Sequence, residues 1–484
     1  MNRDSHLFRW QVITFVTLWL GYAGYYVCRS NLSVAGPLLQ AELAEQPTGA
    51  AENWLREARE AVSGRIQRTF DSVTSLFRGS NPAPDEAAAA PSSVKREEAI
   101  GKRRFGLIAS ISILFYALGK FTSGMVCDFA GGRRMFLFGM FASVVCTVFF
   151  GMATGFAAML ALWSANRLVQ SMGWSALVKV ASRWFPAARH GSIFGMLTLS
   201  YLFGDAIARL GLGMLLHLGL GWRGLFFVAA GVLATIAVAS TFTLRASPAD
   251  VGAPEPDANP ENVYGSRGNA PQPADLVDLL WPLVSSFSFW LVCVISFGLT
   301  VVRETFNTWN PIYLKEAVGL SDASAATASA LFPLVGGLST LAAGWLTDRL
   351  ARGRRGAIML PFLGVLVVVL FGLASLKPES GATVPLLLTS IVSFALLGPY
   401  SFLTGVLSLD FGGKRGSSTA AGLADTAGYL GAIISGYGVG AIAEQHGWAG
   451  AFHTLGTIAA VTFAAAALYW YMHDVRRGRG AAST

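Results

Sequence analysis

The stretch GMVCDFAGGRR at residues 124–134 recurs as GWLTDRLARGRR at residues 344–355. Each copy ends an apolar segment, and each places a glycine four residues before an aspartate that is followed by a pair of arginines. A second pair of matching stretches, HGS at 190–192 and RGS at 415–417, begins apolar segments at a similar offset. The chain is therefore a repeat of two similar halves.

The composition identifies an integral membrane protein. Of the 484 residues, 53% are hydrophobic and 13% are charged, which leaves too little polar surface for a soluble globule. The apolar runs are about 20 residues long with Gly and Pro inside them, as in membrane helices rather than outer-membrane barrels. We expect twelve spans at residues 11–36, 104–126, 133–154, 157–180, 191–217, 222–243, 285–313, 326–347, 356–375, 384–409, 416–442 and 449–472.

Two halves of six spans in parallel repeat are typical of the major facilitator fold. This all-α membrane fold has 12 transmembrane helices in two pseudo-symmetric six-helix bundles, with the substrate site near the midplane between them. We expect one bundle at residues 1–243 and the other at 285–484. Residues 244–284 are rich in Pro, Gly, Asn and Asp, which predicts a flexible cytoplasmic linker.

An insertion at residues 41–103 follows the first span. Apolar residues recur there every three to four positions from Trp54 to Phe77, and Gly79 ends the pattern. The spacing predicts an amphipathic helix on the outer membrane surface or at the mouth of the protein. A regulatory or partner-binding role is one alternative, although the pattern favours a solvent-exposed helix without a separate function.

Lys and Arg concentrate in every second connecting segment, that is, in the segments on one side of the membrane. Positively charged residues favour the cytoplasmic side of short loops, so we expect both termini in the cytoplasm and a bacterial inner membrane as the location. This asymmetry accounts for the net charge of +8 without a nucleic-acid partner. We expect a monomer whose partners are the lipid bilayer and small solutes.

The sequence does not predict an enzyme, a metal site or a cofactor. The four cysteines lie within spans or at their ends, which is unlike a disulfide framework or a metal site. The polar segments contain no nucleophile with a matching base and no phosphate-cradling glycine loop.

Two arginines lie inside apolar spans, and each precedes a proline by eight residues: Arg29 in the first span and Arg303 in the seventh. A guanidinium in hydrocarbon costs about 2.5 to 3.5 kcal/mol on insertion scales, so it persists where it lines a cavity or binds an anion. Their matching places predict one anion site between the halves. Arginine binds phosphate oxygens in a bidentate manner, and two arginines nearly neutralise a phosphate ester of charge about −1.5 to −2.

Several stretches carry a resemblance to a known family. They are GYAGYYVCRSNLSVAGP at 21–37, YALGKFTSGMVCD at 116–128, NRLVQSMGW at 166–174 and GPYSFLTGVLSLD at 398–410. These resemble the organophosphate:phosphate antiporters, which include glycerol-3-phosphate and hexose-phosphate transporters and a membrane sensor of hexose phosphate. The resemblance covers roughly 11–40 and 104–475. It implies that an arginine from each half, here Arg29 and Arg303, grips the phosphate.

Further candidate ligands come from the resemblance and from helical spacing. Lys120 matches a family lysine that faces the central cavity, and Tyr201 stands where the glycerol-phosphate transporter has a histidine. Tyr22, Tyr25 and Tyr26 share nearly one face with Arg29, although tyrosines in membrane helices also serve as packing residues. The remaining candidates are Gln170 and Trp174, for which packing is the stronger alternative, and Asn307, Trp309 and Asp425.

Three acids lie within apolar spans. We expect Asp205 to pair with Arg209 one turn away. Glu304 points about 100° away from its neighbour Arg303 on a helix, which argues against direct neutralisation. Asp425 has three alternatives: it binds a proton, pairs with Lys120, or meets an amine of a zwitterionic phosphate or phosphonate.

The repeated turns contain acids and arginines that are candidates for gating: Asp128, Arg133, Arg134, Asp348, Arg354 and Arg355. We expect them to pair with neighbouring helix ends and to hold the cytoplasmic face closed. Helix capping and anchoring of the topology are the alternative explanation.

The function that the sequence favours is exchange of an organophosphate or phosphonate ester for inorganic phosphate. Without ligand, the two arginines would repel one another across the cavity, which predicts obligatory exchange. A membrane sensor of a phosphorylated sugar and a proton-coupled transporter of another organic anion are the alternatives.

Overall fold

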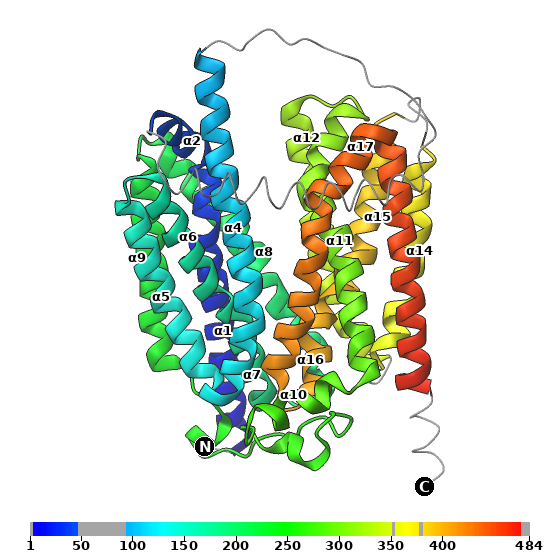
Figure 1. Cartoon of the computed structure of the whole chain (residues 1–484). Coiled ribbons are helices and arrows are strands. Elements are labelled where there is room, and N and C mark those ends of the chain that lie inside the picture. Colours follow the sequence, from blue (N-terminus) through cyan, green and yellow to red (C-terminus); the bar gives the residue numbers. More distant parts are fainter. Residues whose placement is uncertain (1–2, 47–92, 351–353, 377–380, 476–484) are drawn as a thin grey trace.

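The computed structural model describes residues 3–46, 93–350, 354–376 and 381–475, and every regular element within them is a helix. The first half comprises α1 (Arg3–Val34), α2 (Gly36–Glu45), α4 (Ser93–Ala130), α5 (Gly132–Met152), α6 (Phe156–Gln170), α7 (Met172–Trp184), η1 (Ala187–Arg189), α8 (His190–His217) and α9 (Trp222–Thr243). The second half comprises α11 (Phe287–Glu316), α12 (Asp322–Ser329), α13 (Leu331–Arg349), α14 (Arg355–Ala374), α15 (Thr383–Ser401), η5 (Phe402–Val406), α16 (Leu407–Gly412), α17 (Ser417–Tyr469) and η6 (Trp470–Val475). Figure 1 shows the halves as two bundles that stand side by side.

Each of the twelve expected spans falls on one helix or on consecutive helical segments. The fourth span is divided into α6 and α7 at Ser171, and the tenth continues from α15 through the π-helical turn η5 into α16. The eleventh and twelfth spans are joined in α17, which breaks at Gly447, where the backbone φ is 67°. Glycine adopts such a positive φ without the steric cost that other residues meet.

Nine helical segments of the described residues are long and apolar enough to cross a membrane. The spans outside that set are α1, the α6–α7 pair and the first part of α17, which carry polar groups such as Arg29, Lys179 and Asp425. Leu210 and Phe242 are 76% and 71% exposed. Large apolar side chains on the outer surface suit lipid rather than water.

Both ends of the insertion at 41–103 are helical. The helix of the second span, α4, begins at Ser93, about ten residues earlier than the expected span, and α2 extends to Glu45. Arg104 joins them, because its Nη1 donates to the carbonyl oxygens of Leu43 at 2.6 Å and Gln46 at 2.7 Å. The amphipathic helix expected at residues 54–77 lies outside the described residues.

The linker between the halves is folded, so the expectation of a flexible segment is wrong. It contains η2 (Pro248–Val251), η3 (Gly265–Asn269) and α10 (Leu276–Val284). Its backbone pairs with the second half, since the amide of Val263 donates to Phe411 and the carbonyl of Gly268 accepts from Lys414, both at 2.9 Å. Figure 1 shows the linker at the end of the molecule where α1 begins and η6 ends, called here the terminal face.

Candidate functional site

A cavity with about 40 Å³ of space for water-sized molecules lies between the two halves. Its lining comes from α1, α4, α7 and α8 of the first half and from α11, α15, η5 and α17 of the second. The lining residues are Tyr22, Tyr26, Tyr116, Lys120, Trp174, Thr198, Tyr201, Arg303, Tyr400, Ser401, Thr404, Asp425 and Tyr429. The cavity is therefore aromatic and charged, and movement of one half against the other would change its shape.

Arg29 of α1 is not itself among the lining residues, but it contacts the aromatic rings of two of them. Its guanidinium carbon is 4.3 Å from the ring centroid of Tyr26 and 4.7 Å from that of Tyr116. Its Nη2 donates to the Tyr116 hydroxyl at 3.2 Å, and its Nε donates to Oε1 of Gln170 at 3.3 Å. These partners are neutral, so they hold the guanidinium in place without cancelling its charge.

Arg303 of α11 lines the cavity from the second half. Its guanidinium carbon lies 4.4 Å from the ring centroid of Tyr400, and its Nη2 forms an ion pair with Oε1 of Glu304. The expectation that Glu304 points away from Arg303 is wrong. Both side chains are long enough to bend back toward one another, although their Cβ atoms diverge on the helix.

Lys120 and Asp425 form an ion pair across the interface. Nζ of Lys120 in α4 lies 2.6 Å from Oδ2 of Asp425 in α17, and the side chains are 2% and 8% exposed. Of the three alternatives for Asp425, the structure places it against Lys120. Asp205 likewise pairs with Arg209 at 2.8 Å, as expected.

Sequence reasoning missed six of the lining residues, Tyr116, Thr198, Tyr400, Ser401, Thr404 and Tyr429, and also Arg167, which lies against the ring of Tyr116. The ring of Tyr116 faces several cations, because Arg167 lies 4.6 Å and Lys120 lies 5.3 Å from its centroid. Helical spacing from a predicted site residue could have identified Tyr116 and Tyr429. Tyr116 is four residues before Lys120, and Tyr429 is four residues after Asp425, and such spacing puts side chains on one helix face.

Several predicted site residues lie away from the cavity lining. Tyr25 is fully buried within the first half and donates to the carbonyl of Phe136 at 2.7 Å. Trp309 donates from Nε1 to the carbonyl of Ser435 at 3.2 Å, and Asn307 is exposed outside the lining. Gln170 is buried and reaches the site only through Arg29. Tyr25 and Trp309 are therefore packing residues.

Trp174 bridges the halves at the cavity wall. Its indole Nε1 in α7 donates to the carbonyl of Thr404 in η5 at 2.8 Å. A π-helical turn changes the regular pairing of backbone carbonyls, so η5 can offer this oxygen to the opposite half. The prediction that Trp174 lines the cavity agrees with this geometry.

The two aspartates of the repeated motif cap helices of the opposite half. Oδ1 and Oδ2 of Asp348 in α13 accept from the amides of Gly191 at 3.0 Å and Ser192 at 2.6 Å, at the start of α8. Oδ2 of Asp128 in α4 accepts from the amide of Thr419 at 2.8 Å, at the start of α17. A carboxylate at a helix N-terminus satisfies free amides and suits the helix dipole.

The motif glycines allow the close approach that this capping requires. A Cβ on Gly344 would lie 2.4 Å from the carbonyl oxygen of Gly191, and one on Gly124 would lie 2.6 Å from that of Ser418. Residues four apart lie on the same face of a helix. The close backbone contact at each glycine and the carboxylate that caps the opposite half therefore face the same neighbouring helix.

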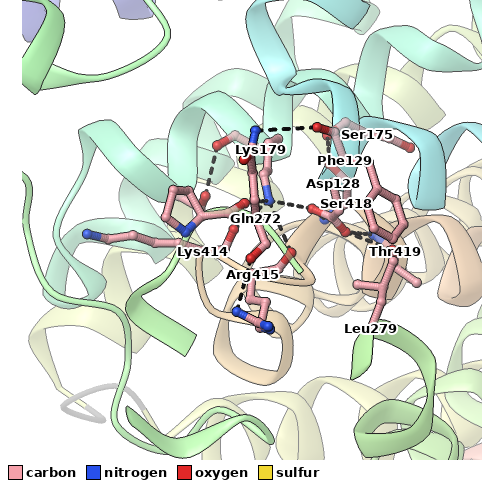
Figure 2. A network of polar contacts seen from close by, with 12 residues as sticks. Asp128, Phe129, Ser175, Lys179, Gln272, Leu279, Lys414, Arg415, Ser418 and Thr419 are labelled. Carbon is pink, nitrogen blue, oxygen red and sulfur yellow. Dashed lines mark hydrogen bonds and ion pairs between the residues drawn. The ribbon is translucent and has the colours of Figure 1, made fainter. Parts of the chain in front are cut away.

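A buried lysine completes the contact around Asp128, as Figure 2 shows. Nζ of Lys179 lies 2.6 Å from Asp128 and donates to the carbonyls of Lys414 at 2.5 Å and Pro271 at 2.8 Å. It thus joins the first half, the second half and the linker. In the sequence, Lys179 resembled one more residue of the basic side of the spans.

The motif arginines differ in their contacts. Arg355 is 3% exposed and pairs with Asp348 at 3.2 Å and Asp410 at 3.0 Å. Arg133 instead donates to the carbonyls of Thr241 and Leu244 at the end of α9, which is capping within the first half. Arg134 and Arg354 are exposed. Among the four motif arginines, only Arg355 contacts an aspartate that binds the opposite half, namely Asp348.

The linker adds carboxylates to the terminal face. Glu255 pairs with Arg183 of the first half at 2.5 Å and with Lys414 of the second at 3.3 Å. Partial burial opposes its charged form, but the hydrogen bonds from Arg183 and Lys414 outweigh this and lower the pKa of Glu255. The amide of Ala274 and then Arg415 lower the pKa of Asp278.

Comparison with known proteins agrees with this architecture. The model of the Major Facilitator Superfamily matches residues 18–436. A probable hexose phosphate transport protein of Chlamydia trachomatis is 27% identical over 366 residues, which cover 73% of this chain and 80% of the relative. The membrane sensor protein UhpC of Salmonella typhimurium is 24% identical over 463 residues, which cover 95% of this chain and 91% of the relative.

The fold also matches solved structures. The fucose:proton symporter FucP of E. coli superposes with a TM-score of 0.65 at 12% identity, covering 95% of this chain and 99% of that one. The names of the relatives confirm the resemblance to organophosphate:phosphate antiporters, and the family match confirms a transport protein rather than an enzyme. The chain is a multi-pass integral membrane protein and belongs to the Major Facilitator Superfamily.

Proposed function

We propose that this protein is a secondary active transporter that exchanges an organophosphate or phosphonate ester for inorganic phosphate by alternating access. The observation that carries the proposal is the placement of two arginines on corresponding helices of the two halves. Arg303 lines the interfacial cavity, and Arg29 contacts two tyrosines that line it. A phosphate that binds both guanidiniums draws the halves together.

The charges around the cavity favour a dianionic phosphate group. Lys120 and Asp425 cancel one another as a close pair, which leaves the two arginines as the principal anchors. The pairing of Asp425 removes the acid that a zwitterionic substrate would need for its amine. A phosphate monoester whose organic part is neutral, and which packs on the aromatic wall, fits these charges best. The relative named for hexose phosphate transport supports the same substrate class.

The contacts that close the terminal face indicate which side of the membrane the cavity is closed to. We assign the terminal face to the cytoplasm, because the basic segments gather there and positively charged loops stay inside. The caps from Asp128 and Asp348 then hold the cytoplasmic end closed. They must separate when the cavity opens to the cytoplasm. We assign the protein to a bacterial inner membrane as a monomer with both termini inside.

Exchange in proteoliposomes tests the proposal. Vesicles loaded with phosphate should take up labelled phosphate, and sugar phosphates or glycerol phosphates should compete. R29K and R303K should lower exchange by tenfold or more, because an ammonium lacks the bidentate fork, whereas R134K at an exposed site serves as the matched control. Exchange that is equal in all four proteins would contradict the site assignment.

A sensor of phosphorylated sugars is the second candidate, and the relative named as a membrane sensor favours it. Its expected result is specific binding of a phosphate ester by folded protein without exchange. The proton-coupled alternative is weaker, because Asp205 and Asp425 are both engaged in ion pairs. Transport of an anion that follows a pH gradient in the absence of internal phosphate would favour it.

A further inference from the structure

The two anchoring arginines carry less net positive charge than their number suggests. Arg303 forms an ion pair with Glu304, and Lys120 forms one with Asp425. Each of these pairs has no net charge. Of the two anchoring arginines, only Arg29 therefore keeps an uncompensated charge. One positive charge is about half of what a phosphate dianion requires for neutrality.

Arg167 supplies a further positive charge beside the same site. It lies in the last turn of α6, and its guanidinium carbon is 4.6 Å from the ring centroid of Tyr116. The guanidinium carbon of Arg29 is 4.7 Å from the same centroid. Within the part of the chain that the structure describes, no carboxylate pairs with Arg29 or Arg167. Two uncompensated guanidiniums therefore contact one aromatic ring.

Arg167 lies at the depth of the cavity rather than at a membrane surface. Figure 1 shows α4 and α6 side by side in the first half. Arg167 is twelve residues before Lys179, and Tyr116 is twelve residues before Asp128, the ion-pair partner of Lys179 at the terminal face. Both therefore lie about 18 Å along their helices from that pair. A guanidinium at this depth is costly in lipid and favours a polar surrounding.

The ring of Tyr116 connects the two arginines to the cavity. Tyr116 lines the cavity, and its hydroxyl accepts from Nη2 of Arg29 at 3.2 Å. An aromatic face attracts a cation without cancelling its charge. The field of Arg167 therefore extends past the ring, and inside a protein a charge acts more strongly than it does in water.

We propose that Arg167 is a third cation of the anion site and that it gives the site a preference for doubly charged ligands. Arg29 and Arg167 together supply two uncompensated positive charges, which match the dianion of a phosphate monoester. Arg167 acts through its charge, because Tyr116 rather than Arg167 lines the cavity. This inference rests on the proposed function and specifies its substrate class, which is a dianionic phosphate or phosphonate ester rather than a singly charged ester.

Binding of two esters of equal shape and unequal charge tests the inference. At pH 8, methyl phosphate is a dianion, because the second pKa of a phosphate monoester is about 6, whereas methyl sulfate is a monoanion. Each ester competes with labelled phosphate for the purified full-length protein. We compare the wild type with R167Q, R167M and R167K. R189Q is the matched control for the change in net charge, because Arg189 is exposed and lies outside the cavity lining.

The expected result is a loss of affinity that depends on the charge of the ligand. R167Q should weaken the binding of methyl phosphate by about tenfold or more, as expected for loss of a nearby unit charge at an effective dielectric constant of about 20. The loss for methyl sulfate should be about the square root of that factor, because Coulomb energy is proportional to ligand charge. R167M should reproduce R167Q, so one neutral variant suffices if the other does not fold. R167K and R189Q should bind as the wild type does.

Three results would overturn the inference and leave the proposed function intact. Equal losses for the two esters in R167Q would assign Arg167 a structural role. A loss in R167K as large as that in R167Q would show that its charge is not what matters, and unchanged binding of methyl phosphate in R167Q would remove Arg167 from the site. Wild-type protein that binds methyl phosphate but does not exchange phosphate overturns the proposed function instead, and the variants still decide the role of Arg167.

Discussion

Asp128 and Thr419 belong to different halves of the chain, and the carboxylate of the first accepts from both the amide and the hydroxyl of the second, at 2.8 and 2.7 Å. Asp348 makes the corresponding contact in the opposite direction, from the second half to the start of α8. Each half therefore supplies a helix cap that the other half lacks. This reciprocity explains why the motif occurs twice.

Removal of the cap charge should open the terminal face. D128N leaves Lys179 as a buried cation with a weaker partner, and loss of one member of a buried pair typically costs about 3 to 5 kcal/mol. Spin labels at positions 134 and 354, whose native arginines are exposed on opposite halves, should report a longer distance in D128N than in the unmodified background. An unchanged distance distribution would argue that Asp128 does not hold the halves together.

Lys179 and Asp128 should behave as one unit. K179M alone leaves a buried carboxylate without its cation, whereas the double variant D128N/K179M removes both charges. We therefore expect the double variant to have a higher melting temperature than K179M, although below the wild type because the carbonyl contacts of Lys179 are lost. Additive losses in a double-mutant cycle would contradict the coupling.

The hydroxyl of Tyr116 should matter for ligand affinity. Y116F keeps the ring beside Arg29 but removes the oxygen that accepts from its guanidinium. We expect an increase of about tenfold or more in the KM for phosphate, in keeping with the loss of one hydrogen bond to a charged group. Y25F is the matched control, because the Tyr25 hydroxyl binds Phe136 within the bundle, and it should lower thermal stability without raising KM.

The Lys120 and Asp425 pair should set the stability of the interface rather than amine selectivity. D425N should impair folding or transport, and K120Q/D425N should recover part of the loss because it leaves no uncompensated charge. Competition by aminoalkyl phosphonates should be no stronger than that by neutral phosphate esters of similar size. A marked preference for the amine that disappears in D425N would instead support the zwitterionic substrate.

The linker contacts should be stable at neutral pH and weaken in acid. Glu255 and Asp278 have pKa values below their usual range, so their contribution is present above the pKa of the unfolded chain. It is lost as the pH falls through the lowered pKa values of the folded state. The protection factors for hydrogen exchange in 244–284 should be high at pH 7 and lower at pH 3.5, each taken relative to the intrinsic exchange rate at that pH. E255Q should remove part of this difference.

The sequence predicts the spans and the fold because both follow from patterns that are local or repeated. Twelve apolar segments and the recurring G-x3-D turns need no knowledge of side-chain contacts. The position of Arg29 was also predictable, since a cation in a span requires a polar environment. Tyr116 and Tyr429 were predictable in the same way, because each lies one helical turn from a charged residue of a span, Lys120 or Asp425.

Other features depend on tertiary contacts that cannot be read from the spacing of residues in the sequence. The helical angle placed Glu304 away from Arg303, but side-chain length allows the two to meet. The composition of 244–284 indicated flexibility, yet Glu255 and backbone groups of the linker pair with both halves. Nothing local in the sequence distinguishes buried Lys179 from the basic residues around it.

The reciprocal caps impose an order on biogenesis. The amide of Ser192 leaves the ribosome 156 residues before Asp348, and Asp128 precedes Thr419 by 291 residues. The first six spans are therefore complete before the second half exists, with an uncapped start of α8 and with Asp128 paired to Lys179 but not yet to Thr419. A nascent chain arrested before residue 348 should be recognised by quality-control proteases at this face, where the finished protein conceals both features.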